Sequence, residues 1–276
     1  MAAVDEIASS LPAGIKTPAQ WPEVKRIDVS DLTEVLGLAV NDMRRATAMS
    51  LSFGIVYALC GFGLSLLLVQ QEVPYLIYPL AMGFALVAPF VGAGLYDISK
   101  RLEAGEQPTW STVYSSMCLA CRRDLRWMAF VTAFAFIIWM DIAAMITFAF
   151  MGFHATTMTE FVREVFTTPN GLLFLGVGNV AGAIIAAAVF SVSVVSFPML
   201  YDRDVDFVTA MVTSVRLVVR NKMTMLAWAL TIGWMMVVSA LSAFLALVFV
   251  LPLLGHATWH LYRRAVAPAA AAAPLH

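Results

Sequence analysis

The sequence predicts an all-α membrane protein with six transmembrane helices and further amphipathic helices at the membrane surface. Of the 276 residues, 61% are hydrophobic and only 13% are charged, whereas soluble domains are roughly half apolar and a quarter charged. Several apolar runs exceed the ~18 residues that mark a transmembrane helix. No basic tract with interleaved aromatic residues is present, so we expect the lipid bilayer, and not a nucleic acid, as a partner.

The first third of the chain predicts a surface helix followed by two spans. Residues 1–30 are interrupted by prolines and are expected to be disordered. Asp31 is expected to cap an amphipathic helix that reaches Arg45. The first two spans are predicted at about 47–69 and 75–96.

The middle third repeats this arrangement. A second surface helix is predicted from Trp110. The third and fourth spans follow at about 127–151 and 172–201, separated by a short amphipathic stretch that begins at Glu160. A third amphipathic segment follows the fourth span and ends at Lys222.

The last third contains an apolar stretch of about 40 residues, which as one helix would be ~60 Å long, or twice the thickness of the hydrocarbon layer. We therefore predict two spans, at about 223–241 and 244–262, that turn near residues 239–243. The Ala- and Pro-rich residues 265–276 are expected to be disordered.

Charge favours six spans over five. We predict that residues 31–264 form one membrane domain. With six spans, every basic residue except Arg163 lies on the same side of the membrane as the two chain termini. The positive-inside rule identifies that side as the cytoplasm. With five spans, Arg263 and Arg264 would lie outside.

The sequence also suggests three repeated units, each an amphipathic helix, a basic corner and a hairpin of two spans. Pro89, Gly92, Tyr96 and Asp97 recur at identical offsets as Pro252, Gly255, Trp259 and His260, and the fourth span ends similarly at Tyr201 and Asp202. The corners align as residues 42–46, 124–128 and 221–225. Asp97, Asp202 and His260 would then lie at one depth, where His260 can share a proton with a carboxylate.

Five polar residues in or beside the spans are candidate functional residues: Asp97, Asp141, Asp202, His256 and His260. His256 and His260 are four residues apart and so share a helix face. They are interpreted as hydrogen-bonding groups, with metal ligation completed by Asp97 or Asp202 as the alternative. No metal site is assigned, because no third ligand is recognisable nearby.

Asp141 is expected near the bilayer centre, where a bare carboxylate is costly. We expect it to form a hydrogen bond to a neighbouring helix, with a proton or ion relay as the alternative. A single carboxylate without a second acid or base supports no enzymatic mechanism, so no catalytic residue is assigned.

Several stretches carry a resemblance to a known family: Ser196–Asp206, Pro252–Arg264, Gly94–Tyr96 with Glu103–Glu106 following, and Ser214–Asn221 before Trp228. The chain resembles, over about residues 27–264, a family of bacterial integral membrane proteins defined as a domain of unknown function. This resemblance implies a multi-pass protein of the bacterial inner membrane and implies no activity or site residues.

Some members of that family are labelled as cytochrome c oxidase, which the histidines allow us to test. A catalytic oxidase subunit needs histidines on several helices to hold haem and copper. The chain has four histidines, of which only His256 and His260 fall within a span, and both lie on one helix. We therefore expect neither a catalytic subunit nor a bound cofactor.

The function predicted from the sequence is that of a non-enzymatic accessory, scaffold or assembly protein, beside respiratory complexes. Its partners would be other membrane proteins or a second copy of the chain. The alternative is a small transporter or ion- or proton-conducting protein that uses Asp141 and the helix face of His256 and His260.

Overall fold

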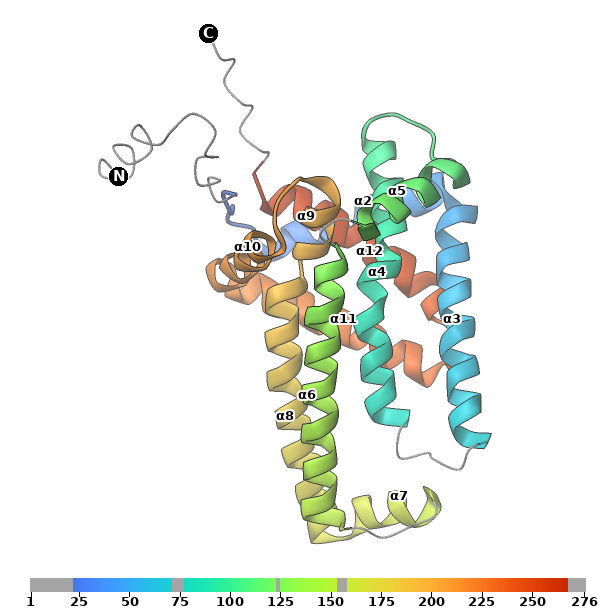
Figure 1. Ribbon diagram of the computed structural model, residues 1–276, viewed down its shortest axis with the longest axis vertical. Helices are drawn as coiled ribbons and strands as arrows, with labels where there is room; N and C mark the ends of the chain where they lie inside the picture. The colour runs from blue at the N-terminus through green and yellow to red at the C-terminus, as the bar shows by residue number, and fades with distance from the viewer. Residues whose placement is uncertain (1–21, 71–76, 123–124, 153–157, 268–276) are drawn as a thin grey trace, which may run out of the picture.

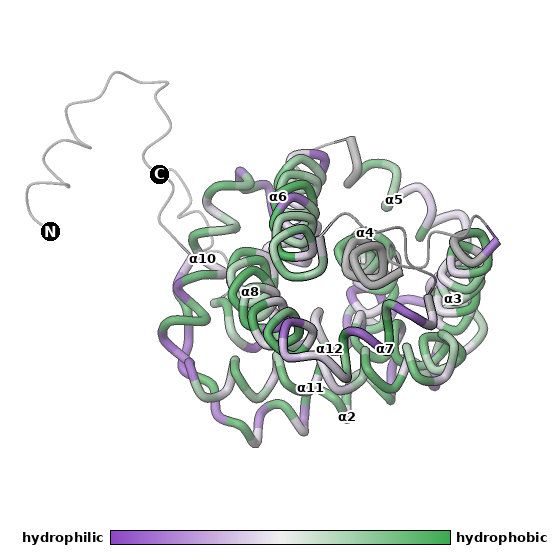
Figure 2. Tube along the Cα trace, turned by 90° about the horizontal axis from the view of Figure 1, so that it is seen from below, coloured by the Kyte–Doolittle hydropathy of each residue, from purple (hydrophilic) through white to green (hydrophobic). Residues whose placement is uncertain are grey.

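A computed structural model describes residues 22–70, 77–122, 125–152 and 158–267 of the chain (Figure 1). Four long helices run side by side along the long axis: α3 (Thr47–Gln70), α4 (Ile77–Glu103), α6 (Leu125–Met151) and α8 (Pro169–Ser193). A view from below shows these helices nearly end-on, with mostly hydrophobic residues along them (Figure 2). The predicted all-α class is confirmed for the described residues.

Shorter helices lie at the two ends of this bundle. The helices α2 (Val29–Arg45), α5 (Trp110–Arg122), α9 (Ser196–Asp202) and α10 (Phe207–Arg220) gather at one end, and α7 (Met158–Thr167) lies at the other (Figure 1). The last two helices, α11 (Lys222–Leu241) and α12 (Leu247–Ala265), cross the bundle obliquely.

Within the described residues, four stretches are long and apolar enough to cross a membrane, judged by length and composition. They are Thr47–Leu67, Leu125–Met151, Pro169–Asp202 and Lys222–Leu241. The last apolar stretch does turn, but later than the predicted residues 239–243, because α11 ends at Leu241 and α12 begins at Leu247. Ala243 and Phe244, with φ of 50° and 68°, reverse the chain there.

The helix α12 lies at the centre of the structure and packs against α2, α3 and α4. Its residues from Gly255 to Tyr262 are buried on almost every side, and Trp259 and Tyr262 are among the largest fully buried side chains. Helix α12 can approach α3 and α4 closely because a glycine lies at one contact with each of these helices. A Cβ atom at Gly54 would lie 2.2 Å from the carbonyl oxygen of Val248, and one at Gly255 would lie 2.4 Å from a methyl group of Leu95.

The ends of the membrane domain are more ordered than expected. Val24 forms a β-bridge with Val266, Ile27 is buried, and α2 begins at Val29 and α12 ends at Ala265, so the prediction of disorder is wrong for residues 22–30 and 265–267. Burial of these isolated apolar side chains orders the two segments, which are too short to show a periodic pattern. Residues 1–21 and 268–276 lie outside the described residues.

The start of α2 also differs from the prediction. Asp28, not Asp31, is the N-cap residue of this helix. Asp31 is the third helical residue, and its Oδ2 accepts a hydrogen bond of 2.7 Å from the Asp28 backbone N–H. This is the reciprocal half of a capping box.

The predicted fourth span is interrupted near its end. Helix α8 stops at Ser193, and α9 begins at Ser196. Pro198 explains the break, because it has no N–H to donate to the carbonyl of Val194 and its ring crowds that carbonyl. Helices α4 and α12 continue through Pro89 and Pro252.

Two of the predicted corners have nearly the same backbone geometry. Ala46, between α2 and α3, has φ −126° and ψ 44°, and Asn221, between α10 and α11, has φ −123° and ψ 46°. The structure therefore aligns Ala46 with Asn221. The predicted alignment of Asp42 with Asn221 is wrong by four residues.

Gly54→Ala is expected to lower the free energy of unfolding by about 1–3 kcal/mol, because the new methyl group would overlap the backbone of α12. The matched control is Gly63→Ala on the same helix, where a Cβ atom meets nothing within 4 Å. The control should be neutral or slightly stabilising, since alanine favours a helix more than glycine does. Denaturant unfolding in mixed micelles would measure both; equal effects would contradict the close crossing of α3 and α12.

Candidate functional site

A buried polar network at the α2 end of the bundle begins at His256. This side chain of α12 is fully buried. Its Nε2 lies 2.9 Å from Oγ of Ser50 on α3, and its Nδ1 lies 2.8 Å from Oγ of Ser99 on α4. Both serines are also fully buried. The imidazole therefore joins three helices.

The hydrogen bonds fix the direction in which protons are donated. The Ser99 hydroxyl donates to Oδ2 of Asp42 at 2.7 Å. Because its one proton is used there, the Nδ1–H of His256 must be the donor to Ser99. The bare Nε2 then accepts the hydroxyl proton of Ser50. Neutral His256 is thus fully hydrogen-bonded, which removes the cost of burying its polar atoms.

Asp42 links this chain to His260. The Nε2 of His260 lies 2.7 Å from Oδ2 of Asp42, and the two side chains are only 13% and 7% exposed. The predicted partners of His260 were Asp97 and Asp202, so the expectation of a shared carboxylate is correct in kind but wrong in its residue. The network Ser50–His256–Ser99–Asp42–His260 joins α2, α3, α4 and α12.

Asp42 was missed because it stands close to Arg44 and Arg45 and so looks like part of a solvated face. Its spacing was the available signal. Asp42 follows the buried residues Val35 and Ala39 at seven and three residues, which places it on the apolar stripe of α2.

The environment of Asp42 favours its charged form. Burial alone would raise the pKa of this carboxyl, but hydrogen bonds from His260 and Ser99 outweigh burial and hold the pKa below its ordinary value. Asp42 is thus a carboxylate at neutral pH, held by two donors on one oxygen.

Asp97 and Asp202 belong to a second set of contacts at the same end. Asp97 accepts hydrogen bonds from the Tyr201 hydroxyl at 2.5 Å and from Arg101 Nε at 2.7 Å. Asp202 accepts the Tyr262 hydroxyl at 2.8 Å and lies 2.8 Å from Lys100 Nζ. Each aspartate is therefore bound by a tyrosine from a later part of the chain.

Asp141 lies apart from both sets. It is exposed on α6, and within the part of the chain that the structure describes it has no hydrogen bond or ion pair. The expected hydrogen bond to a neighbouring helix is thus not found among those residues.

The buried network holds helices together and does not have the form of a catalytic site. A serine nucleophile must reach a substrate, whereas Ser50 and Ser99 are fully buried. Moreover, Ser99 stands between His256 and Asp42, so the carboxylate does not orient the imidazole directly as in a hydrolase triad. Among the described residues, no three His, Cys, Asp or Glu side chains come together as a metal site would require.

The central part of the chain is similar to a known family. Residues 77–202 match the family model described as "Predicted integral membrane protein (DUF2189)". The matched stretch runs from α4 to α9, is less than half of the chain, and includes Asp97, Asp141 and Asp202. No curated protein and no solved structure matches the chain. The chain is an integral membrane protein with four candidate spans among the residues that the structure describes.

Asp42→Asn is expected to lower the free energy of unfolding of this membrane protein by about 1–3 kcal/mol, because a buried charged acceptor is lost. The control is Asp141→Asn, an exposed carboxyl, which should change stability by less than about 0.5 kcal/mol. A carboxyl with a lowered folded pKa contributes its stability above its unfolded pKa of about 3.9 and loses it as pH falls through the folded pKa. The difference between wild type and Asp42→Asn should therefore narrow below about pH 4; a constant difference would contradict the charged Asp42.

Proposed function

We propose that the chain is a non-enzymatic accessory protein of the bacterial inner membrane that acts as a scaffold by binding a transmembrane helix of a partner along the outer face of α6. The observation that carries this proposal is Asp141, a carboxyl exposed on a span with no partner within the described chain. Asp141 is ten residues from the end of α6 at Met151, about 15 Å along the helix. It is therefore well inside the span.

The face around Asp141 has the spacing of a helix-pairing seam. Phe130, Phe134, Ile137, Asp141 and Ala144 are all exposed, and they follow one another at intervals of four, three, four and three residues. This 3.5-residue period keeps one stripe of a helix against another helix over the ~21 Å that it spans. The other faces of α6 pack against α8 and α4, so the stripe is the side available to a partner.

Energy favours covering this face with protein. A carboxyl at the centre of a span costs about 2.5–3.5 kcal/mol on insertion scales when it faces lipid. An interhelical hydrogen bond contributes ~0.6 kcal/mol and up to ~2 kcal/mol, and it also removes the carboxyl from lipid. A single polar residue within an apolar seam also fixes the register of pairing.

The contacts of the histidines favour this role over transport. The alternative function requires Asp141 and the helix face of His256 and His260 to line one path. His256 is fully buried between α3, α4 and α12, whereas Asp141 is on the exposed face of α6. We propose a respiratory complex as the partner because some members of the family that the sequence resembles are labelled as cytochrome c oxidase.

We also propose the finer membrane arrangement: six spans, both termini in the cytoplasm, and three repeated units. The turn between α11 and α12 and the matching corners at Ala46 and Asn221 support it. Three hydrogen bonds also support this arrangement, because each of them joins a different pair of the proposed units, which are α2–α4, α5–α9 and α10–α12. Tyr201 binds Asp97, Tyr262 binds Asp202, and His260 binds Asp42.

A photo-crosslinking residue at Ile137 is expected to give a discrete adduct in intact membranes, whereas one at Ile184, an exposed position on α8 that is 66% accessible, should give none. The adduct should persist in Asp141→Asn, which keeps a hydrogen-bonding group, and fall strongly in Asp141→Leu, which leaves a purely apolar face. An adduct of twice the chain's mass identifies a second copy, and any other mass identifies a different protein. An adduct that survives Asp141→Leu unchanged would refute the role of the carboxyl.

Six spans predict that cysteines at Thr159 and Leu245 react with an impermeant reagent added outside the cell, and that a cysteine at Gln107 does not. All three positions are exposed, and Cys60, Cys118 and Cys121 would first be replaced by alanine. Thr159 serves as the control for the outer side in this experiment. Protection of Leu245 with labelling of Thr159 would reject the crossing of α11 and α12.

A further inference from the structure

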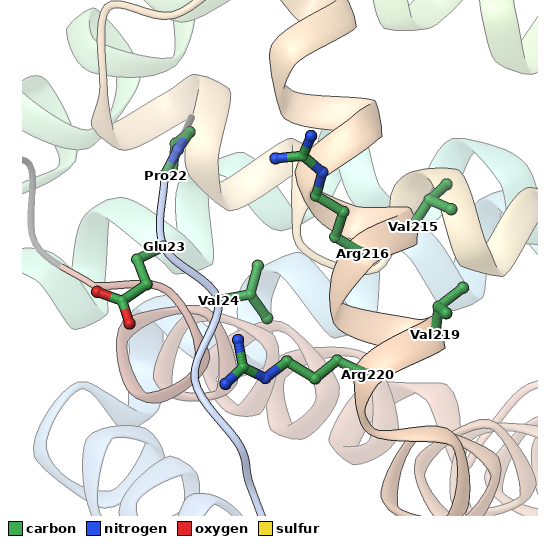
Figure 3. A pocket seen from close by; sticks show the side chains of 7 residues that line it. All are labelled: Pro22, Glu23, Val24, Val215, Arg216, Val219 and Arg220. Carbon is green, nitrogen blue, oxygen red and sulfur yellow. The ribbon is translucent and has the colours of Figure 1, made fainter. Parts of the chain in front are cut away.

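A groove of about 550 Å³ lies between α10 and the extended segment that precedes α2. One wall is formed by Pro22, Glu23 and Val24, and the other by Arg216, Val219 and Arg220 (Figure 3). Neither the buried polar network nor the α6 face uses any of these residues.

Hydrogen bonds of the backbone hold the wall 22–24 in place. The Ala267 N–H donates to the Glu23 carbonyl at 2.9 Å, and the Lys25 N–H donates to the Ala265 carbonyl at 2.8 Å. On the other side, α10 is fixed by its N-cap, where Asp206 accepts a hydrogen bond of 2.8 Å from the Thr209 N–H. The groove therefore exists before any ligand enters it, which lowers the cost of binding.

The charged groups of the groove are arranged for an anion. Arg216 and Arg220 are one turn apart on α10, and both side chains extend toward the segment 22–24 (Figure 3). The carboxylate of Glu23 points away from them (Figure 3). A guanidinium group presents parallel N–H donors that match the oxygens of a phosphate.

The apolar groups around the arginines indicate an amphiphilic anion. Val24 and Val219 line the groove between and beside the two arginines. Val219 is 59% exposed, and the exposed side chains of Met223 and Leu226 follow it on α11. Because the candidate span Lys222–Leu241 begins directly after α10, the groove residues of α10 lie close in the chain to the start of a span.

We propose that the groove binds the phosphate of an anionic phospholipid, with Arg216 and Arg220 on the phosphate and Val219 against the start of the acyl chains. Helix α10 packs beside α8, α9 and α11, where two candidate spans end, so the groove lies at the depth of lipid headgroups. The bound lipid fastens the N-terminal segment to α10. This site is independent of the partner proposed for α6.

The test uses the purified full-length protein in detergent, titrated with short-chain phosphatidylglycerol, short-chain phosphatidylcholine or inorganic phosphate, with bound lipid counted by native mass spectrometry. Wild type should retain phosphatidylglycerol in preference to the other two. Arg216→Gln with Arg220→Gln should weaken its binding at least tenfold, and the lysine pair should weaken it less because the charge is kept. Arg220→Gln alone should also weaken binding, and the melting temperature of each lipid-free variant separates a loss of binding from a loss of stability.

The matched control is Arg44→Gln with Arg45→Gln, which removes the same charge from the exposed end of another amphipathic helix. Binding should be unchanged in this control. An equal loss in both double variants would show attraction to general surface charge and would overturn the site. Equal retention of phosphatidylcholine, or inorganic phosphate that competes at the same concentration as the lipid, would overturn the lipid assignment.

Discussion

The fold depends on the need to satisfy the two histidines of α12 inside a protein core. A buried polar group that lacks a hydrogen bond lowers the stability of the fold by about 1–3 kcal/mol. His256 is fully buried and so cannot form a hydrogen bond to solvent. Its two nitrogen atoms require Ser50 and Ser99 at fixed distances. The position of α3 relative to α4 is therefore set through α12.

The same constraint reaches the surface helix α2. Ser99 donates to Asp42, and Asp42 also holds His260, so an amphipathic helix that would otherwise only rest on the bundle is tied to its centre. Close packing makes these short distances possible, because Gly54 and Gly255 let α12 approach the backbone of α3 and the side chain of Leu95. A network of this kind specifies one arrangement of the helices, since a partly satisfied version would be costly.

The pair of α6 and α8 is less enclosed by the rest of the chain, which is why we propose the binding surface on α6. Helix α6 buries only one side against α8 and α4, which leaves Asp141 outside. A carboxyl on such a face is costly in lipid, and the partner helix that we propose would lower that cost. The protein thus has a buried network in which His256, Ser99 and Asp42 are hydrogen-bonded to one another or to their neighbours, and an outer face on which the Asp141 carboxyl is exposed.

Much of the fold could be predicted from sequence patterns that involve only neighbouring residues. Apolar length predicted the helical class, and excess length predicted the turn before Leu247. The break before Pro198 was not predicted because a proline does not always interrupt a helix, as Pro89 and Pro252 show. The order around Val24 depends on contacts with Val266, far away in the sequence, which one sequence does not show. His256 and His260 were recognised as site residues because they are ionisable residues within a predicted span. Asp42 was not recognised, because its contact with His260 joins residues 218 positions apart.

The most direct measurement of the central claim is a double-mutant cycle between Asp42→Ala and His260→Ala, read as free energy of unfolding in mixed micelles. If the two side chains bind each other within the core, the coupling energy should be about 1–3 kcal/mol, because removing either partner already removes their interaction. Additive losses, with a coupling below about 0.5 kcal/mol, would contradict the claim that the buried network ties α2 to α12.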